Sequence, residues 1–290
     1  MEVASGDRNN HLIFNFLFLI FNISAMPLVF AAIAPHPPVL IPEIGQDNLK
    51  KLKKTKAAVE KLESELYAAK PESILIISPH GQVMPEAFNI NLSPNYQSDF
   101  KEFGDFGLML EFKSDYMAIQ NIRAGDETQK KVNLVLTSQP SIDHGFSVPL
   151  YYLTKHFKNL PIIPVTPAEL DYQKHFQFGE FLNQRLAVID KRVAVIASAD
   201  LSHKLTKDAP AGYSKKGAEF DQRFLALLKK NEVKGILALE PKLVSEAGVC
   251  GLRSIIILLG LISSMSFKSE LLSYEGPFGV GYAVVNFNFQ

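Results

Sequence analysis

Short continuous apolar segments alternate with longer amphipathic segments along most of the chain. The clearest apolar segments have the length of strands buried on both faces: 28–34 (LVFAAIA), 73–77 (SILII) and 193–197 (VAVIA). Further strands are expected at 133–137, at 162–165 and, as one or two strands, at 280–287. Helices are expected at 47–69, 148–157, 172–188, 217–230 and 250–261. The alternation predicts an α/β fold: one domain with a mostly parallel central sheet and helices on both faces.

Local signals refine two of these segments. Asp47 is expected to cap the first long helix, which would end near Ala69 ahead of Pro71. The mixed segment 91–121 is rich in Gly and Phe and predicts a hairpin and loop rather than a helix.

The amino terminus carries no charged side chain from Asn9 to Pro42. A signal peptide requires a basic leader, whereas Glu2 and Asp7 here outnumber Arg8. A membrane span of about 20 apolar residues would have to include the first predicted strand. We therefore expect residues 1–25 to be an apolar extension ahead of a domain at 26–290, with a membrane anchor as the alternative.

Composition excludes some classes of function. The chain has 30 basic and 30 acidic side chains, so its net charge gives no electrostatic basis for binding nucleic acid. Its single cysteine excludes an internal disulfide and a zinc ribbon with paired cysteines. A lone thiol fits a reducing compartment, and we expect a cytoplasmic protein.

Four of the seven histidines follow predicted strands directly, in short loops that contain Pro, Gly, Ser or Asp: His36, His80, His144 and His203. In an open α/β sheet such loops converge on one crevice, where ligands bind. Neutral imidazole binds metal ions, and near pH 7 it also carries protons. We therefore expect one mononuclear metal site, with two histidines as ligands and two that move protons or hold substrate.

Two aspartates stand near these histidines. Asp143 precedes His144 directly, and Asp200 lies three residues before His203. Either carboxylate could orient an imidazole of the metal site without binding the metal itself. The alternative for both is a turn or a helix cap.

A third metal ligand is expected near Cys250, at the start of an apolar helix pattern. A helix amino terminus lowers the pKa of a thiol and favours the thiolate. The alternative is a small buried hydrophobic residue, the usual state of a free cysteine. Glu246 and Glu275 are the carboxylate alternatives for the third ligand.

Six short motifs occur in an order that resembles a known family. They are Ala34-Pro35-His36-Pro37-Pro38, Ser78-Pro79-His80-Gly81, Asp143-His144-Gly145, Ser198-Ala199-Asp200-Leu201-Ser202-His203, Cys250-Gly251-Leu252-Arg253-Ser254 and the closing stretch 273–282. Together they resemble the LigB-like family of class III extradiol ring-cleavage dioxygenases. The nearest branch is the one linked to AMMECR-type and Memo proteins in the AmmeMemoRadiSam system. The resemblance covers residues 26–290.

The resemblance implies a ferrous ion, Fe(2+), held by two histidines and a carboxylate, with open positions for a catechol and O2. His36 and His80 match the two histidine ligands. His203 matches the acid–base histidine of the family. His144 matches a second active-site histidine near the oxygen-binding side. The implied partners are a small aromatic substrate and O2, and a homo-oligomer could complete the exposed loops.

One departure from the family pattern concerns the third ligand. Cys250 stands where most of the family has glutamate, and Memo-like members resemble this chain in having cysteine there. A thiolate shifts the metal preference from iron toward Zn(2+) or Cu. The first hypothesis is an oxidoreductase that inserts both oxygen atoms of O2 into an aromatic diol. The second is a Memo-like metal-binding protein that serves AMMECR-type or radical-SAM partners without ring cleavage. A zinc hydrolase ranks last, because no HExxH motif is present.

Overall fold

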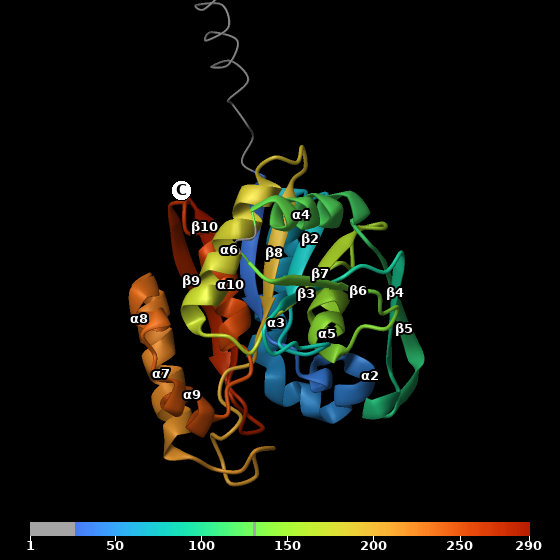
Figure 1. Cartoon of the computed structure of the whole chain (residues 1–290). Helices are drawn as coiled ribbons and strands as arrows, with labels where there is room; N and C mark the ends of the chain where they lie inside the picture. Colours follow the sequence, from blue (N-terminus) through green and yellow to red (C-terminus); the bar gives the residue numbers. More distant parts are fainter. Residues whose placement is uncertain (1–26, 130–131) are drawn as a thin grey trace, which may run out of the picture.

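The computed structural model of the protein describes residues 27–129 and 132–290, and Figure 1 shows them as one α/β domain. Eight strands form the central sheet in the order β6-β3-β7-β2-β8-β1-β10-β9. The predicted extension at 1–25 lies outside the described residues. No helix within the described ranges is long and apolar enough to cross a membrane.

Four parallel strands form the centre of the sheet: β1 (Leu28–Ala34), β2 (Ser73–Ile77), β7 (Ile162–Thr166) and β8 (Val193–Ser198). Strand β8 pairs in parallel with β1 and β2, and β2 pairs in parallel with β7. Nearly every residue of these strands is buried, as expected for strands covered on both faces. The predicted parallel sheet is thus confirmed.

The edges of the sheet are antiparallel in part. On one side, β10 (Tyr282–Phe289) pairs antiparallel with both β1 and β9 (Phe267–Glu275). On the other side, β3 (Phe88–Asn91) pairs antiparallel with β7 and parallel with β6 (Leu134–Thr137). The alternating burial of β9 explains why its sequence lacks the continuous apolar run of the central strands.

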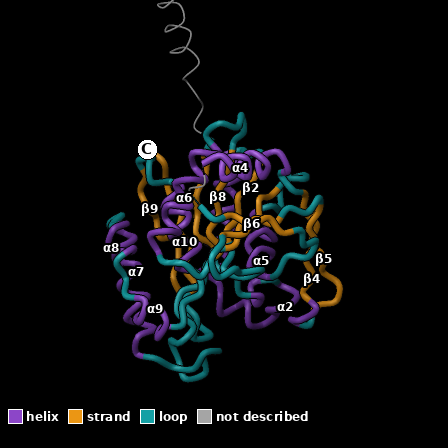
Figure 2. Tube along the Cα trace, viewed as in Figure 1, coloured by secondary structure: helices purple, strands orange, loops and turns teal. Residues whose placement is uncertain are grey.

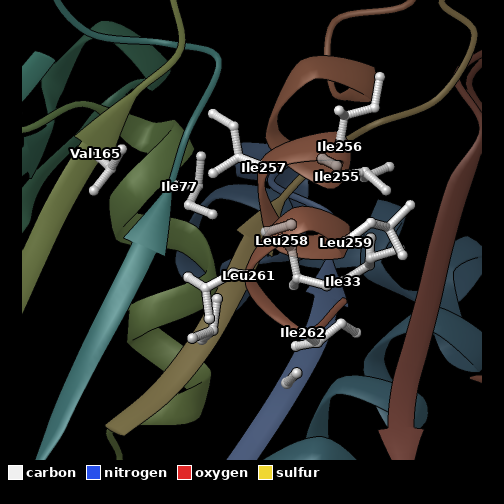
Figure 3. Close-up of a cluster of buried hydrophobic side chains, with 14 of the residues drawn as sticks. Ile33, Ile77, Val165, Ile255, Ile256, Ile257, Leu258, Leu259, Leu261 and Ile262 are labelled. Carbon is white, nitrogen blue, oxygen red and sulfur yellow. The ribbon is translucent and has the colours of Figure 1, made fainter. Parts of the chain in front are cut away.

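Helices cover both faces of the sheet, as predicted (Figure 2). One face packs against α4 (Tyr116–Gln129), α6 (Tyr172–Leu186), α7 (Lys215–Lys229) and α10 (Leu252–Leu261). The other face packs against α3 (Lys53–Ala69) and α5 (His144–Leu153). Figure 3 shows apolar side chains of α10 over Ile33, Ile77 and Val165, which come from three parallel strands. This packing holds α10 against the sheet.

The remaining elements are short. A hairpin of β4 (Asn95–Phe100), η3 (Lys101–Phe103) and β5 (Asp105–Lys113) stands beside α5 in Figure 1. Three short helical segments precede α3, namely η1 (Pro38–Leu40), α2 (Pro42–Gly45) and η2 (Gln46–Leu52). Two more follow α7, namely α8 (Val233–Leu237) and α9 (Pro241–Ala247).

Three sequence predictions need correction. Asp47 does not cap the long helix, because 46–52 is a 3-10 segment and Asp47 pairs with Lys50 on the surface. Instead, the carboxylate of Glu275 accepts the backbone N–H of Thr55 in the first turn of α3. The hairpin within 91–121 is confirmed, but α4 occupies the end of that segment. The helix expected at 148–157 begins four residues earlier, at His144, so this histidine is helical rather than in a loop.

Candidate metal centre

The carboxyl ends of neighbouring parallel strands bring the site residues together. His36 follows β1, His80 follows β2, and Asp200 follows β8, which lies between these two strands. Parallel strands end at the same edge of a sheet, so their following loops meet there. The topology therefore explains how histidines 44 positions apart come into contact.

Backbone hydrogen bonds hold Cys250 against the same edge. The N–H of Gly251 donates to the carbonyl of Asp200 (3.1 Å), and the N–H of His203 donates to the carbonyl of Gly248 (3.3 Å). Gly251 allows this close approach, since a Cβ there would lie 2.6 Å from the Cα of Ala199. The loop before α10 is thereby fixed to the loop after β8.

Three side chains converge with suitable donor atoms. Nε2 of His36 lies 3.1 Å from Nε2 of His80 and 3.7 Å from Sγ of Cys250. One ligand atom from each residue lies within 4.8 Å of the others. Tetrahedral bonding to zinc would place two nitrogens about 3.3 Å apart, and a nitrogen and a sulfur about 3.6 Å apart. The donor set thus fits one metal ion with room for further ligands.

A hydrogen-bond chain fixes the tautomer of His36. The hydroxyl of Ser198 donates to the carbonyl of Gly145, so its oxygen is left to accept from Nδ1 of His36 (2.9 Å). Nδ1 therefore carries the proton, and Nε2 presents a lone pair toward His80 and Cys250. Ser198 is wholly buried, so no water competes for this contact.

His203 and His144 flank the three donor atoms. Nδ1 of His203 donates to the carbonyls of Gly248 (3.0 Å) and Leu201 (3.2 Å), which leaves Nε2 free to accept a proton. The ring of His144 lies 4.6 Å from the ring of His80 between centroids. All four histidines singled out in the sequence therefore belong to one cluster.

Burial sets the charge of this cluster. It lowers the pKa of all four clustered histidines, and the nearby charges of His80, His144 and His203 lower the pKa of His36 further. The imidazoles are therefore neutral at pH 7, the form that binds metal.

The protonation state of the Cys250 thiol differs from the prediction based on its position at the amino end of a helix. Burial, followed by the charge of Asp200, raises the pKa of Cys250. In the metal-free protein the thiol therefore stays protonated, because burial outweighs the helix amino terminus. A bound metal ion would displace this proton.

The two aspartates have different partners. Oδ1 of Asp200 accepts the backbone N–H of His36 (3.0 Å), and its Oδ2 lies 3.6 Å from Nε2 of the same histidine. Burial raises the pKa of Asp200 to about 7. Asp143 caps α5 by accepting the N–H of Gly145 (2.7 Å), which is the alternative considered for it. Asp200 thus contacts His36 rather than His203.

The two glutamates have other roles. Glu246 pairs with Lys242 on the exposed side of α9 (3.9 Å), and Glu275 accepts from both the N–H and the hydroxyl of Thr55. Neither belongs to the cluster of ligand atoms found among the described residues.

Sequence reasoning assigned no role to Ser198 or to Gly145. Ser198 belongs to one of the six motifs, and its signal is a polar side chain at the buried end of a strand that leads into the site. Gly145 is needed because a Cβ there would lie 2.3 Å from Oγ of Ser78 and 2.9 Å from Cδ2 of His80. Both residues act through contacts between distant segments, which local patterns do not reveal.

Several known proteins resemble this chain in sequence. The family profile described as "Catalytic LigB subunit of aromatic ring-opening dioxygenase" matches residues 30–285. Protein CA_C1420 of Clostridium acetobutylicum is 33% identical over 263 residues, which are 87% of this chain and 55% of that protein. A 2,3-dihydroxyphenylpropionate/2,3-dihydroxicinnamic acid 1,2-dioxygenase of Xanthobacter autotrophicus is 33% identical over 78 residues, 25% of either chain. The chain thus spans about half the length of the first relative, and a 78-residue segment of it matches a quarter of the second.

A solved structure shares the fold. The crystal structure of the uncharacterized protein JW3007 from Escherichia coli superposes with a TM-score of 0.60 at 13% identity. The match covers 89% of this chain and 99% of that chain. At this identity the likeness concerns the fold alone.

Proposed function

Because the chain belongs to the family of catalytic LigB subunits of aromatic ring-opening dioxygenases, we propose that it is a metal-dependent oxidoreductase of the extradiol type. It would insert both oxygen atoms of O2 into an aromatic diol. The observation that carries this proposal is the convergence of Nε2 of His36, Nε2 of His80 and Sγ of Cys250 between two further neutral histidines.

The metal would be ferrous iron, Fe(2+), held by His36, His80 and Cys250. When bound, it supplies Lewis acidity, redox capacity and open coordination positions for a catechol and for O2. The protein contributes two neutral imidazoles and a thiol that would lose its proton to the metal. Asp200 holds the backbone of His36 while Ser198 holds its ring, so the ligand nitrogen faces the site.

Proton transfer is assigned to the flanking histidines. Nε2 of His203 has a free lone pair because Nδ1 donates to two carbonyls, so it can take a proton from a catechol hydroxyl. The same nitrogen can return the proton later in the reaction. The ring of His144 lies against that of His80, and His144 is assigned to donate to or accept from the oxygen substrate.

A second candidate function follows from the thiol. Cys250 in the third ligand position favours Zn(2+) or Cu over iron. The protein would then be a Memo-like metal-binding member of an AmmeMemoRadiSam system. In that role it would serve AMMECR-type or radical-SAM partner proteins and cleave no aromatic ring.

The test is to purify the full chain without oxygen, measure bound metal, reconstitute with ferrous iron, and follow oxygen uptake with a panel of catechols. We expect about one metal ion per chain, and oxygen uptake with a catechol that opens the ring. His36→Ala should lose the metal, while the control His156→Ala should keep it, since the exposed His156 pairs with Glu63 on α3, away from the site. Full metal binding by His36→Ala would contradict the site, and a loaded protein without oxygen uptake would favour the second candidate.

A further inference from the structure

A cavity of about 250 Å³ opens beside the histidine cluster. It shares Asp143 and His144 with the site, and Gly81, which also lines it, directly follows His80. Its outer wall is the η3 turn of the β4–β5 hairpin, where the ring of Phe103 lies 5.2 Å from the ring of His144. A molecule in this cavity would therefore lie one side chain away from the donor atoms.

The charge of the lining is negative. Asp99, Glu102 and Asp143 line the cavity, whereas no lysine or arginine among the described residues does. Asp99 is partly balanced by an ion pair with Lys101 (2.8 Å). Glu102 takes part in no ion pair within the described part of the chain. Glu102 lines the same cavity as Asp143 and His144, so its charge faces a molecule that binds there.

Part of the neutral hydrogen-bonding capacity of the lining is used within the protein. The side-chain amide of Asn89 donates to the carbonyl of Gln82 (3.0 Å), and that of Asn91 donates to the carbonyl of Gln139 (2.8 Å). Each of these two amide groups therefore has one of its two N–H donors engaged by the protein. A carboxylate in this cavity would meet acidic side chains without a basic partner, and such like-charge contacts are costly.

The same lining suits a cation. A protonated amine would pair with Glu102 and could lie over the face of Phe103, an arrangement that stabilises ammonium groups. The volume is small, so the cavity accommodates a short chain rather than a second ring system.

We propose that this cavity holds the ring substituent of the catechol substrate and selects an amine-bearing, cationic substituent over a carboxylate. The inference rests on the proposed function, because the ring itself would bind at the metal. It predicts a substrate class different from the acid named for the relative from Xanthobacter autotrophicus.

Three catechols that differ only in the end of one side chain provide the test. Dopamine ends in an ammonium group, dihydrocaffeate in a carboxylate, and ethylcatechol substituted at the same ring position in a methyl group. Their dissociation constants would be measured by calorimetry on the full chain loaded with ferrous iron, in the absence of oxygen. We expect dopamine to bind at least about tenfold more tightly than dihydrocaffeate, with ethylcatechol between them, and the ratio to shrink at high salt.

Two variants locate the effect. Glu102→Gln should reduce the ratio between dopamine and dihydrocaffeate several-fold, whereas Glu111→Gln, an exposed glutamate on β5 outside the cavity, should not change it. Equal binding of the two charged catechols, or an unchanged ratio in Glu102→Gln, would overturn the inference while ethylcatechol binding still supported the proposed function. Failure of all three catechols to bind would overturn both.

Discussion

Ser198→Ala removes only one hydroxyl group, but it should weaken metal binding strongly. The hydroxyl accepts the Nδ1 proton of His36 at 2.9 Å and donates to the carbonyl of Gly145, all in a buried environment. Its removal leaves a buried donor and a buried acceptor without partners, at a cost of about 1–3 kcal/mol for each group. It also frees His36 to adopt the other tautomer, and loss of such a partner typically lowers metal affinity by about 10- to 100-fold.

The assay is a zinc titration against a competing chelator, paired with chemical unfolding of the metal-free protein. Ser73→Ala is the matched control, because Ser73 is equally buried but its hydroxyl contacts the carbonyl of Pro161 at the opposite end of β2. We expect both variants to lose stability and only Ser198→Ala to lose zinc affinity. Wild-type zinc affinity in Ser198→Ala, or an equal loss in Ser73→Ala, would refute the reasoning about the tautomer.

Three further predictions concern packing, titration and proton release. Gly145→Ala should lower both the melting temperature and the zinc affinity, because its Cβ would press on Oγ of Ser78 and on the ring of His80. Thermal unfolding and zinc titration would measure this, and an unchanged zinc affinity would contradict it. Burial raises the pKa of Asp221 from about 4 in the unfolded chain to about 6, so ionisation of Asp221 should progressively destabilise the folded state between pH 4 and pH 6, by up to about 3 kcal/mol. Unfolding curves should therefore show that Asp221→Asn does not lose this part of its stability as the pH rises from 4 to 6. If the stabilities of the wild type and of Asp221→Asn fell in parallel over this range, the loss would not come from Asp221. At pH 8, where Asp200 is ionised and the clustered histidines are neutral, zinc binding should release about one proton from the Cys250 thiol. Calorimetry in buffers of different ionisation enthalpy would detect it, and Cys250→Ala should bind zinc weakly without that release.

The central sheet was predictable because burial on both faces requires continuous apolar segments. β1, β2 and β8 carry such segments and were located to within one residue. β9 was missed, since an edge strand exposed in part mixes charged and apolar residues as a loop does. The cap of α3 was also missed, because Glu275 reaches it from a segment 220 positions away.

The site was also predictable only in part, because contacts between segments distant in the sequence leave no local pattern. The position of His144 is set by α5, because β6 runs antiparallel to the central strands. The other three histidines follow parallel strands, whose ends meet at one edge, and this indicated where they would lie. Their tautomers depend on Ser198 and on backbone carbonyls that no local pattern reveals. For Cys250 a local rule gave the wrong result. Its position at a helix end predicted a thiolate, whereas burial raises the pKa of the thiol and keeps it protonated.

The ligand set itself can be read by X-ray absorption at the zinc edge of the loaded full chain. A site built from His36, His80 and Cys250 should give nitrogen scatterers at about 2.0–2.1 Å and one sulfur scatterer at about 2.3 Å. Cys250→Ser should lose the sulfur contribution and keep the nitrogens. A spectrum of the wild-type protein without sulfur, or one in which the imidazole signature survives in His36→Ala with His80→Ala, would contradict the proposed centre.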